Sequence, residues 1–344
     1  MKKSNPPQLK SPRSKRPTRS VSIVGTGSYM PARVMTNAEF EKLVDTSDEW
    51  ITTRTGIRER RLAAPNEHTS DLAAEAARRA MAQANVKPEE IELIIVATIT
   101  PDMPFPATAC FVQQKIGATR AACFDVEAAC AGFLYALEIG QQFITAHTYN
   151  TVLVIGAEKL SSIIDWKDRN TCVLFGDGAG AAILRSRGES EHGVITTCMG
   201  TDGSKALLLH MPGGGARCPA THQSVDNRLH HLRMEGKEVF KSAVGAMQTA
   251  AEEALRRCGL TINDIACIIP HQANVRIIEA IAERISAPKE KIFINLDKYG
   301  NTSAASVIVA LDEAVRSGRV QRGDFLLLVV FGAGFTWAAS VLQW

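Results

Sequence analysis

The sequence lacks a long hydrophobic run. Its longest nearly unbroken apolar segment, FLLLVVFGAGF at positions 325–335, has 11 residues, whereas a membrane-spanning helix needs roughly 18 or more. We therefore expect no membrane-spanning segment and no membrane partner. With 45% hydrophobic residues over 344 positions, the chain can bury a large core, as one big domain or as two of ordinary size. These features predict a soluble globular protein.

Cysteine pairs and a secretory signal are missing as well. The eight cysteines are scattered and none belongs to a CxxC pair, which favours reduced thiols and a cytoplasmic location. Cys218 and His222 are close in sequence, and His230 and His231 follow in the same Gly/Pro-rich stretch, 211–233. A structural zinc site usually takes two such close pairs. We therefore expect a surface loop here and no metal site.

Acidic residues are absent from the first 20 positions, which carry seven Lys or Arg and four Pro. This composition predicts a disordered basic tail over residues 1–20. Subtracting its +7 from the formal net charge of +3 leaves −4 for residues 21–344, so no nucleic-acid partner is expected. An organellar transit peptide is the alternative interpretation of the tail, although the segment is short and shows no amphipathic pattern.

The body of the chain contains an internal duplication. A shift of 174 positions places Ile91–Thr98 on Ile265–Gln272, two short apolar runs that predict buried strands. The same shift places the helix-like segment 73–86 on 247–260. Each half therefore reads helix, strand, helix, strand, which predicts an α/β fold with two parallel-rich sheets covered by helices.

The duplication divides the body into an N-terminal half, 21–190, and a C-terminal half, 191–344. It also places Cys130 opposite Ala304, at the start of the matching helix in the other half. If these two helix N-termini converge, their N–H groups and positive dipole ends would face one small pocket. We expect this geometry to lower the pKa of the Cys130 thiol.

Three polar residues stand at the ends of the duplicated elements, namely Cys130, His271 and Asn301. Taken singly, each has a structural interpretation as an inert buried thiol, a satisfied loop histidine or a helix N-cap. Together they provide a nucleophile and two hydrogen-bond donors. Such donors can stabilise negative charge that develops on a thioester oxygen.

Several longer strings connect these residues to a known family: TSDEWITTRTGIRERR (46–61), DVEAACAGFLYAL (125–137), FGDGAGAA (175–182), PHQANVRII (270–278), GNTSAASV (300–307) and FGAGFTW (331–337). With them, the chain from Val21 to Trp344 closely resembles β-ketoacyl-acyl-carrier-protein synthase III, the initiating condensing enzyme of bacterial fatty-acid synthesis. The resemblance implies the thiolase fold, in which duplicated halves form a five-layered αβαβα sandwich, and a homodimer. It implies an acyltransferase that uses acetyl-CoA and malonyl-acyl-carrier protein as substrates and needs no cofactor.

The resemblance also implies the roles of the polar residues. Cys130 would take an acetyl or other short acyl group from a CoA thioester. His271 and Asn301 would stabilise the enolate formed when malonyl-acyl-carrier protein loses CO₂, and its attack would give acetoacetyl-acyl-carrier protein. The backbone N–H groups of Cys130 and Ala333 would hold the oxyanion. Relatives often have glycine at the position of Ala333, so we expect this loop to have less φ freedom here.

Binding residues follow from the same resemblance. Trp50, Arg54 and Arg169 would hold CoA, since an indole and a guanidinium can sandwich adenine and arginine binds phosphate. Phe105 would reach across the dimer to close the partner's acyl pocket.

A basic patch would dock the acidic carrier protein. The resemblance assigns this patch to Lys241, Gln272 and Arg276. Relatives often show two lysines where this chain has Glu283 and Arg284, so we expect a weaker or shifted docking surface.

Other interpretations of the Cys, His, Asn order remain. A papain-type hydrolase has a similar spacing, but the context Ala-Cys-Ala-Gly-Phe and the duplication argue against it. A degradative thiolase needs a second cysteine near the C-terminus, whereas the last one here is Cys267. A related condensing enzyme of polyketide or secondary metabolism is the nearest alternative. A non-enzymatic scaffold of the same fold would leave the three polar residues as cap and packing residues.

Overall fold

The computed structural model describes residues 19–186 and 193–344. The predicted tail lies outside these ranges except for residues 19 and 20, as does the predicted boundary between the halves at 190/191. Among the residues that the structure describes, no helix is long and apolar enough to cross a membrane.

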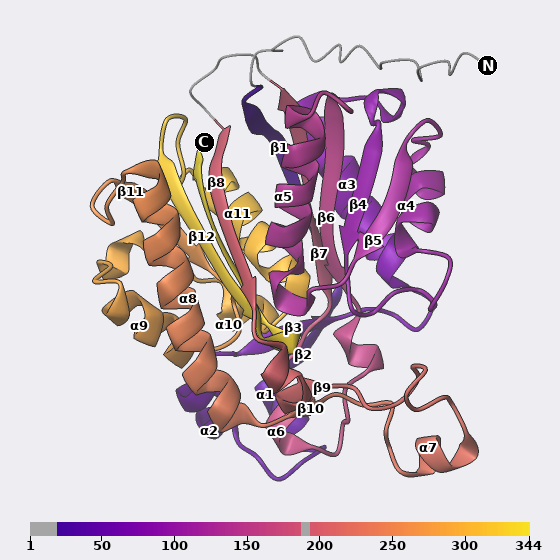
Figure 1. The fold of residues 1–344 in the computed structure, drawn as a ribbon. Coiled ribbons are helices and arrows are strands. Elements are labelled where there is room, and N and C mark those ends of the chain that lie inside the picture. The colour runs from indigo at the N-terminus through magenta and orange to yellow at the C-terminus, as the bar shows by residue number, and fades with distance from the viewer. Residues whose placement is uncertain (1–18, 187–192) are drawn as a thin grey trace, which may run out of the picture.

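Strands and helices alternate along the chain (Figure 1). The strands are β1 (Val21–Tyr29), β2 (Arg33–Thr36), β3 (Glu59–Leu62), β4 (Leu93–Ala97), β5 (Ala122–Val126), β6 (Thr151–Glu158), β7 (Gly178–Ser186), β8 (Gly193–Thr201), β9 (Leu209–His210), β10 (Arg233–Met234), β11 (Ile265–Pro270), β12 (Phe325–Gly332) and β13 (Thr336–Gln343). The α-helices are α1 (Asn37–Phe40), α2 (Asp48–Thr55), α3 (Thr69–Ala84), α4 (Thr108–Ile116), α5 (Gly132–Thr145), α6 (Arg169–Cys172), α7 (His222–Asp226), α8 (Gly236–Cys258), α9 (Val275–Arg284), α10 (Leu296–Tyr299) and α11 (Ser306–Arg316). The 3-10 helices are η1 (Pro88–Glu90), η2 (Ala129–Ala131), η3 (Leu160–Ser162), η4 (Gly203–Leu208), η5 (Lys289–Lys291), η6 (Ser303–Ala305) and η7 (Ala333–Phe335).

Local sequence signals set several helix ends. The Ser47 side chain accepts a hydrogen bond from Trp50 N at the start of α2, and Gly56 ends that helix with φ of 79°. Asn274 caps α9 by accepting from Arg276 N. These ends follow ordinary capping rules, with a short polar side chain first and a left-handed glycine last.

Two sheets and three helical layers make up the body (Figure 1). The first sheet has the order β1-β7-β6-β4-β5 and the second β11-β12-β13-β8. Helices α3 and α4 cover the outer face of the first sheet, α8 and α9 cover that of the second, and α5 and α11 lie between the sheets. This arrangement confirms the predicted five-layered αβαβα sandwich.

The sheets contain fewer parallel pairs than the sequence predicts. Strand β4 pairs in parallel with β5 and β6, and β11 with β12, whereas the other main-sheet pairs are antiparallel. Strand β13 follows β12 after only residues 333–335, and a connection that short cannot make the crossover that a parallel pair requires.

The predicted duplication is visible element by element. A shift of 174 positions takes β6 onto β12 and η2 onto η6, and it brings the first residue of α5 onto the first residue of α11. Helices α3 and α8 end at equivalent positions, Ala84 and Cys258. The two halves therefore repeat one structural unit around the central helices.

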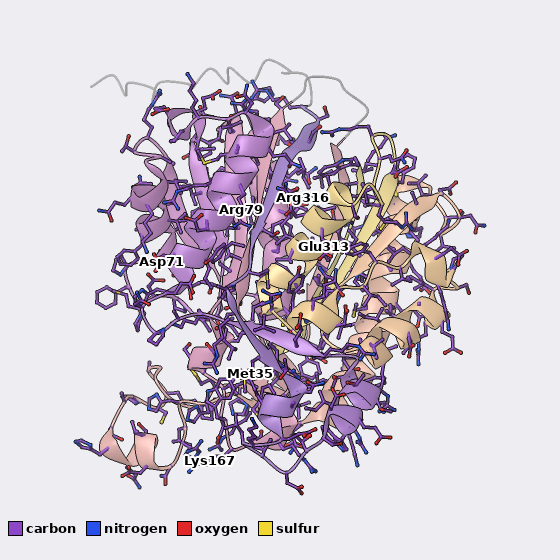
Figure 2. All side chains as sticks on the ribbon, turned by 180° about the vertical axis from the view of Figure 1, so that it is seen from behind. Met35, Asp71, Arg79, Lys167, Glu313 and Arg316 are labelled. Atoms are coloured by element: carbon purple, nitrogen blue, oxygen red, sulfur yellow. The ribbon has the colours of Figure 1, made fainter. Side chains whose placement is uncertain are left out.

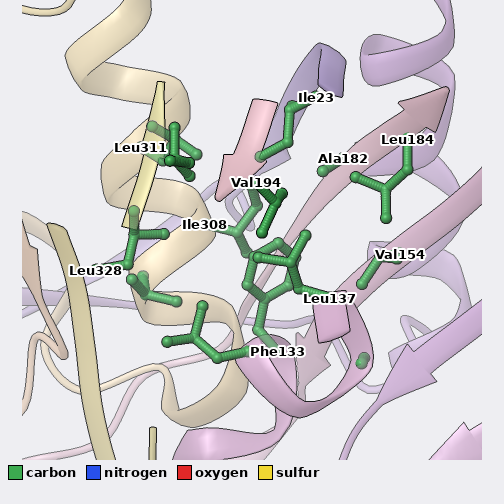
Figure 3. Packing of buried hydrophobic residues seen from close by; sticks show 14 of the residues in the cluster. Ile23, Phe133, Leu137, Val154, Ala182, Leu184, Val194, Ile308, Leu311 and Leu328 are labelled. Carbon is green, nitrogen blue, oxygen red and sulfur yellow. The ribbon is translucent and has the colours of Figure 1, made fainter. Parts of the chain in front are cut away.

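The central helices share one hydrophobic core (Figure 3). Phe133 and Leu137 of α5 pack in the same cluster as Ile308 and Leu311 of α11, together with Leu328 of β12. Burying a side chain of this size contributes roughly 1.5–3 kcal/mol. This shared core, to which α5 and α11 both contribute, therefore fixes the two halves relative to each other.

A polar cluster joins the halves on the face of the molecule that Figure 2 shows, where Arg79 and Arg316 are labelled. The buried Asp312 of α11 accepts hydrogen bonds from Thr26 Oγ1 at 2.8 Å and Ser28 Oγ at 2.7 Å, both on β1. Arg316 Nε lies 3.0 Å from the Asp312 carboxylate. These contacts tie α11 of the second half to the first strand of the chain.

A close backbone approach limits one position between the halves. A Cβ atom added to Gly156 of β6 would lie less than 3.0 Å from the carbonyl oxygen of Ala304 in η6. Only glycine lets the strand and the turn meet at this distance.

We expect Gly156→Ala to lower the free energy of unfolding by about 1–3 kcal/mol, because backbone atoms must move apart to admit the methyl group. Gly245→Ala is the matched control, since a Cβ there meets nothing within 4 Å in the middle of α8. That variant should equal or exceed the wild type by up to about 1 kcal/mol. Denaturant unfolding of both variants checks the prediction, and equal destabilisation would contradict it.

Candidate active site

One cavity of about 750 Å³ lies where the halves meet. Its lining contains Cys130 from the first half and His271, Asn301 and Ala333 from the second. The structure thus brings together the four residues that the sequence assigns to catalysis and the oxyanion hole, although they are distant in the chain.

Cys130 lies in the 3-10 turn η2, two residues before α5 begins. The preceding residue, Ala129, has φ of 45°, and its equivalent in the other half, Ser303, has φ of 48°. Left-handed backbone is costly for residues other than glycine, and such strain tends to persist at functional sites. Both turns are therefore held by their surroundings in a conformation that aims their residues into the cavity.

Burial raises the pKa of the Cys130 thiol to about 12, a hydrogen bond from the Ser303 side chain opposes this shift, and the nearby Glu158 charge adds to it. The expectation that the helix start lowers the pKa of this thiol is therefore wrong for this structure. Removal of the sulfur from water outweighs the favourable N–H groups because a desolvated thiolate is costly. Cys130 is thus a thiol at neutral pH and must lose a proton when it reacts.

His271 directly follows β11 and is buried beside α11. Its Nδ1 atom lies 2.6 Å from Ser306 Oγ, and its backbone N–H donates to Val329 O at 2.8 Å. Burial lowers the pKa of His271 to about 4, so the ring is neutral at physiological pH. With Ser306 as the donor to Nδ1, the ring carries its proton on Nε2 and can donate it to a substrate oxygen.

Two hydrogen bonds hold the backbone of Asn301, one through its N–H and one through its carbonyl. Its N–H donates to Leu174 O at 2.9 Å and its carbonyl accepts from Gly176 N at 3.0 Å. The side-chain Oδ1 accepts from Ser303 N at 2.8 Å. This last bond is the turn cap that the structural interpretation predicts, and it leaves the Nδ2 group as the donor that Asn301 presents to the cavity.

The loop around Ala333 faces the nucleophile. Ala333 does not have left-handed φ; Gly334 does, at 73°, as does Phe335, at 52°. The φ restriction expected for alanine at this position therefore does not arise. Thr336 Oγ1 donates to Ala128 O at 3.0 Å, which ties this loop to the turn that carries Cys130.

Trp50 and Arg54 line the same cavity. The guanidinium groups of Arg54 and Arg169 lie 4.9 and 5.0 Å from the centre of the Trp50 ring. The structure therefore places all three predicted CoA-binding residues together, with two positive charges beside one aromatic surface.

Two other predicted residues, Phe105 and Lys241, lie outside the lining of this cavity. Phe105 is 83% exposed and does not line the cavity of its own chain, so its role in a partner's pocket stays a prediction. Lys241 lies with Phe240, Glu283 and Arg284 in a separate open groove between α8 and α9. Arg276 lines the main cavity.

The buried position of Gln272 contradicts its predicted role in docking the carrier protein. The residue is buried, its Nε2 donates to Pro270 O at 2.7 Å and its Oε1 accepts from Asn295 N at 3.0 Å. A side chain used in this way anchors the loop after β11 and does not reach a partner.

The stretch 211–233 forms a loop with the short helix α7, and His230 Nε2 lies 2.9 Å from Ser224 Oγ. Over the described ranges 19–186 and 193–344, no group of three His, Cys, Asp or Glu side chains is arranged to hold a metal ion. The absence of a metal from this protein stays a prediction.

Sequence reasoning missed two residues beside the nucleophile, Ser303 and Glu158. Ser303 stands opposite Ala129 under the shift of 174 positions, so the duplication alone could have marked it. Glu158 gives no such signal, because its importance comes from its burial.

Comparisons with known proteins agree with this geometry. A family profile described as "3-Oxoacyl-[acyl-carrier-protein (ACP)] synthase III" matches residues 124–203, and the profile of the C-terminal part of the same enzymes matches 255–344. The chain is 59% identical over 325 residues to the β-ketoacyl-[acyl-carrier-protein] synthase III of Caldanaerobacter subterraneus subsp. tengcongensis, covering 94% of this chain and 98% of the relative. The chain belongs to the β-ketoacyl-acyl-carrier-protein synthase III family. The protein is therefore an acyltransferase.

Solved structures extend the comparison. The 3-oxoacyl-[acyl-carrier-protein] synthase III of Aquifex aeolicus is 49% identical and superposes with a TM-score of 0.88, covering 94% of this chain and all of that one. The priming β-ketosynthase of the R1128 polyketide pathway is 38% identical, with a TM-score of 0.89 and 98% of each chain covered. The Aquifex aeolicus enzyme is the more similar of these two in sequence, and a papain-type hydrolase is not favoured.

We expect the His271 ring to stay neutral from pH 8 to about pH 5, because its pKa is lowered to about 4. An unfolded histidine titrates near 6.5, so this group favours the folded state fully above pH 6.5 and loses that contribution as the pH falls towards 4. Nitrogen NMR of histidine-labelled enzyme checks this, with His271→Ala identifying the signal. Titration of that signal near pH 6.5 would contradict the assignment.

Proposed function

We propose that Cys130, His271 and Asn301 catalyse a decarboxylative condensation of a short acyl-CoA, such as acetyl-CoA, with malonyl-acyl-carrier protein. The product is acetoacetyl-acyl-carrier protein, and the reaction initiates fatty-acid synthesis. The observation that carries the proposal is the single cavity in which a thiol, a neutral imidazole and an amide donor meet. The relatives at 59% and 52% identity bear the name of this activity.

Acylation of Cys130 is the first step. The sulfur attacks the acyl carbon of the CoA thioester, and the backbone N–H groups of Cys130 and Ala333 receive the oxyanion. The Thr336 bond to Ala128 O supports this role, because it fixes the two loops relative to each other.

Decarboxylation is the second step. Loss of CO₂ from the malonyl group places negative charge on its thioester oxygen, and the Nε2 of His271 and Nδ2 of Asn301 donate to that oxygen. A neutral imidazole suits this task, since it donates without adding a permanent charge to a buried site. The enolate carbon then attacks the acyl group on Cys130. The reaction uses only these side chains and the release of CO₂, so we propose that no cofactor takes part.

CoA binds at the mouth of the cavity on Trp50, Arg54 and Arg169. Arginine forks match phosphate oxygens, and an indole stacks on adenine. The carrier protein docks beside it on Lys241 and Arg276, on α8 and α9. The groove that contains Lys241 also holds one acid, Glu283, and one base, Arg284, which weakens the basic character expected from relatives.

The enzyme acts as a homodimer in the cytoplasm. Strand β5 is an edge strand paired on one side only, and the exposed Phe105 ring stands nearby in the chain, before α4. Unpaired sheet edges and exposed aromatic rings are features that a partner subunit covers. The eight cysteines are free thiols, in keeping with a reducing compartment.

The half-reactions should separate in single variants. His271→Ala and Asn301→Ala should still accept acetyl from acetyl-CoA but release CO₂ about 100- to 1,000-fold more slowly, since removing one preorganised donor has this cost. Cys130→Ala should form no acetyl-enzyme yet release CO₂, because both donors remain. Radiolabelled acetyl transfer and CO₂ release measure the two steps. CO₂ release at the wild-type rate by Asn301→Ala would return that residue to a purely capping role.

Charge reversal at Arg276 should affect docking alone. We expect Arg276→Glu to raise KM for malonyl-acyl-carrier protein about tenfold while acetylation by acetyl-CoA is unchanged, because the carrier protein is acidic. The wild-type KM should rise with salt. Lys289→Glu, an equally exposed change in η5 outside the cavity lining, is the control. A parallel fall of both half-reactions would show that Arg276 supports the fold.

A further inference from the structure

Glu158 is a fully buried acid next to the active site that the proposed mechanism does not use. It is the last residue of β6. Its Oε2 accepts hydrogen bonds from Thr100 Oγ1 at 2.6 Å, Thr98 Oγ1 at 3.1 Å and Ile99 N at 3.1 Å. Its Oε1 accepts from Ser303 Oγ at 3.0 Å. The carboxyl group is therefore held rigidly and directed at the turn η6.

No cation compensates this acid. The groups that face it are three hydroxyls and one N–H, and none of the ion pairs formed by residues 19–186 and 193–344 involves it. Burial raises the pKa of Glu158 to about 7, against the opposing hydrogen bonds. The titratable side chain that responds to its charge is Cys130. A carboxyl group in this state can gain or lose a proton at neutral pH.

Ser303 stands between Glu158 and the nucleophile. Its hydroxyl donates to Glu158 Oε1 at 3.0 Å, and Ser303 lines the cavity together with Cys130. Burial raises the pKa of the Cys130 thiol, and hydrogen bonding by the Ser303 side chain acts against this shift. A hydroxyl has one proton and can donate it to only one partner at a time. When Ser303 donates to ionised Glu158, it accepts from the Cys130 thiol. When Glu158 is protonated, Ser303 can donate to the Cys130 thiolate instead.

This series of side chains, from Cys130 through Ser303 to Glu158, can meet a need of the reaction. Cys130 is a thiol at rest and must lose its proton during acylation. We propose that Ser303 and Glu158 relay that proton, a role that rests on the proposed acylation of Cys130. In this proposal Ser303 exchanges a proton with the reacting sulfur and is a catalytic residue, and Glu158 is a positioning residue that acts through it.

The step balances. As the Cys130 sulfur forms its bond to the acyl carbon, its S–H bond breaks and the proton passes to Ser303 Oγ, while the Ser303 proton passes to Glu158 Oε1. The thioester bond to CoA then breaks, and the departing CoA thiolate takes up a proton by the reverse path through Ser303. Glu158 is ionised again, and the net change moves the Cys130 proton to CoA.

His271 is another group that could accept this proton, and it lines the cavity itself. Burial lowers the pKa of His271 to about 4 and raises the pKa of Glu158 to about 7, so the usual order of these two bases is reversed. Glu158 is the stronger acceptor. His271 stays neutral and remains a donor for decarboxylation, so the two half-reactions use different proton-handling groups.

Glu158→Gln and Ser303→Ala test the relay. Glutamine keeps the volume and can accept from Thr100, but it cannot take up the proton. Alanine fits the backbone of position 303, because Ala129 adopts nearly the same φ in the other half. Asp177→Asn and Ser340→Ala are matched controls, since each removes a buried carboxylate or hydroxyl away from the cavity.

Single-turnover acetyl transfer from acetyl-CoA should fall about 100-fold or more in Glu158→Gln and in Ser303→Ala, the usual size of a general-base contribution. The double variant should fall no further, because the two residues act as one unit. The controls should acetylate within about threefold of the wild type. CO₂ release from malonyl-acyl-carrier protein should stay within about threefold in all of them.

The pH profile gives a readout that a structural role would not change. The relay needs ionised Glu158, so wild-type acetylation should rise with pH through about 7, the pKa of that group, and then level off. Glu158→Gln should lack this inflection and keep rising at higher pH, as the thiol ionises directly into solvent.

Acetylation of Glu158→Gln at or above the wild-type rate would overturn the relay, because Glu158 would then act only as a charge that suppresses the thiolate. An equal fall of acetylation and CO₂ release, with a lower melting temperature, would also overturn it, and Ser303→Ala decides if Glu158→Gln fails to fold. A wild-type enzyme that takes no acetyl group would overturn the proposed function itself, and with it the relay.

Discussion

The site depends on one packing constraint: the strand ends and turns of the two halves support each other crosswise. The end of β6 in the first half packs on η6 of the second, and β12 of the second half packs on η2 of the first. Glycine is required at both contacts, since a Cβ at Gly332 would lie 2.6 Å from Cys130 N and one at Gly156 would overlap Ala304 O. Each turn with a left-handed residue, Ala129 in η2 and Ser303 in η6, packs against a strand of the other half. The duplicated fold thus creates a site that a single half does not contain.

Burial at the junction of the two halves shifts the pKa values of three side chains away from their ordinary values. The pKa of the Cys130 thiol is raised to about 12, that of Glu158 is raised to about 7 and that of His271 is lowered to about 4. In each case removal from water disfavours the charged form. At neutral pH the cavity therefore holds a thiol and a neutral imidazole, and the Glu158 carboxyl group buried next to it exchanges its proton. A site of this kind admits an uncharged acyl thioester readily, and apart from the Glu158 carboxylate it develops charge only as the reaction proceeds.

The cavity mouth differs from its interior. Arg54 and Arg169 bring positive charge to the Trp50 ring, while the catalytic end is enclosed by small residues and apolar strands. This separation suits a substrate with a charged nucleotide at one end and a small acyl group at the other. The groove beside α8 and α9 carries charges of both signs, so the proposed docking of a carrier protein there would depend on the position of each charge more than on a large basic surface.

The sequence by itself determined the duplication and the pairing of Cys130 with Ala304, because repeated local patterns specify which elements are equivalent. Together with the family resemblance, it also predicted Cys130, His271 and Asn301 as the reactive set. Only the tertiary structure decided the burial and the hydrogen-bond partners of individual side chains. Gln272 is a buried anchor, burial raises the pKa of the Cys130 thiol, Ser303 lines the cavity, and Glu158 is buried next to it. Burial and hydrogen-bond partners depend on segments more than a hundred residues apart, such as Glu158 and Ser303, and no local pattern in the chain records which of them will meet.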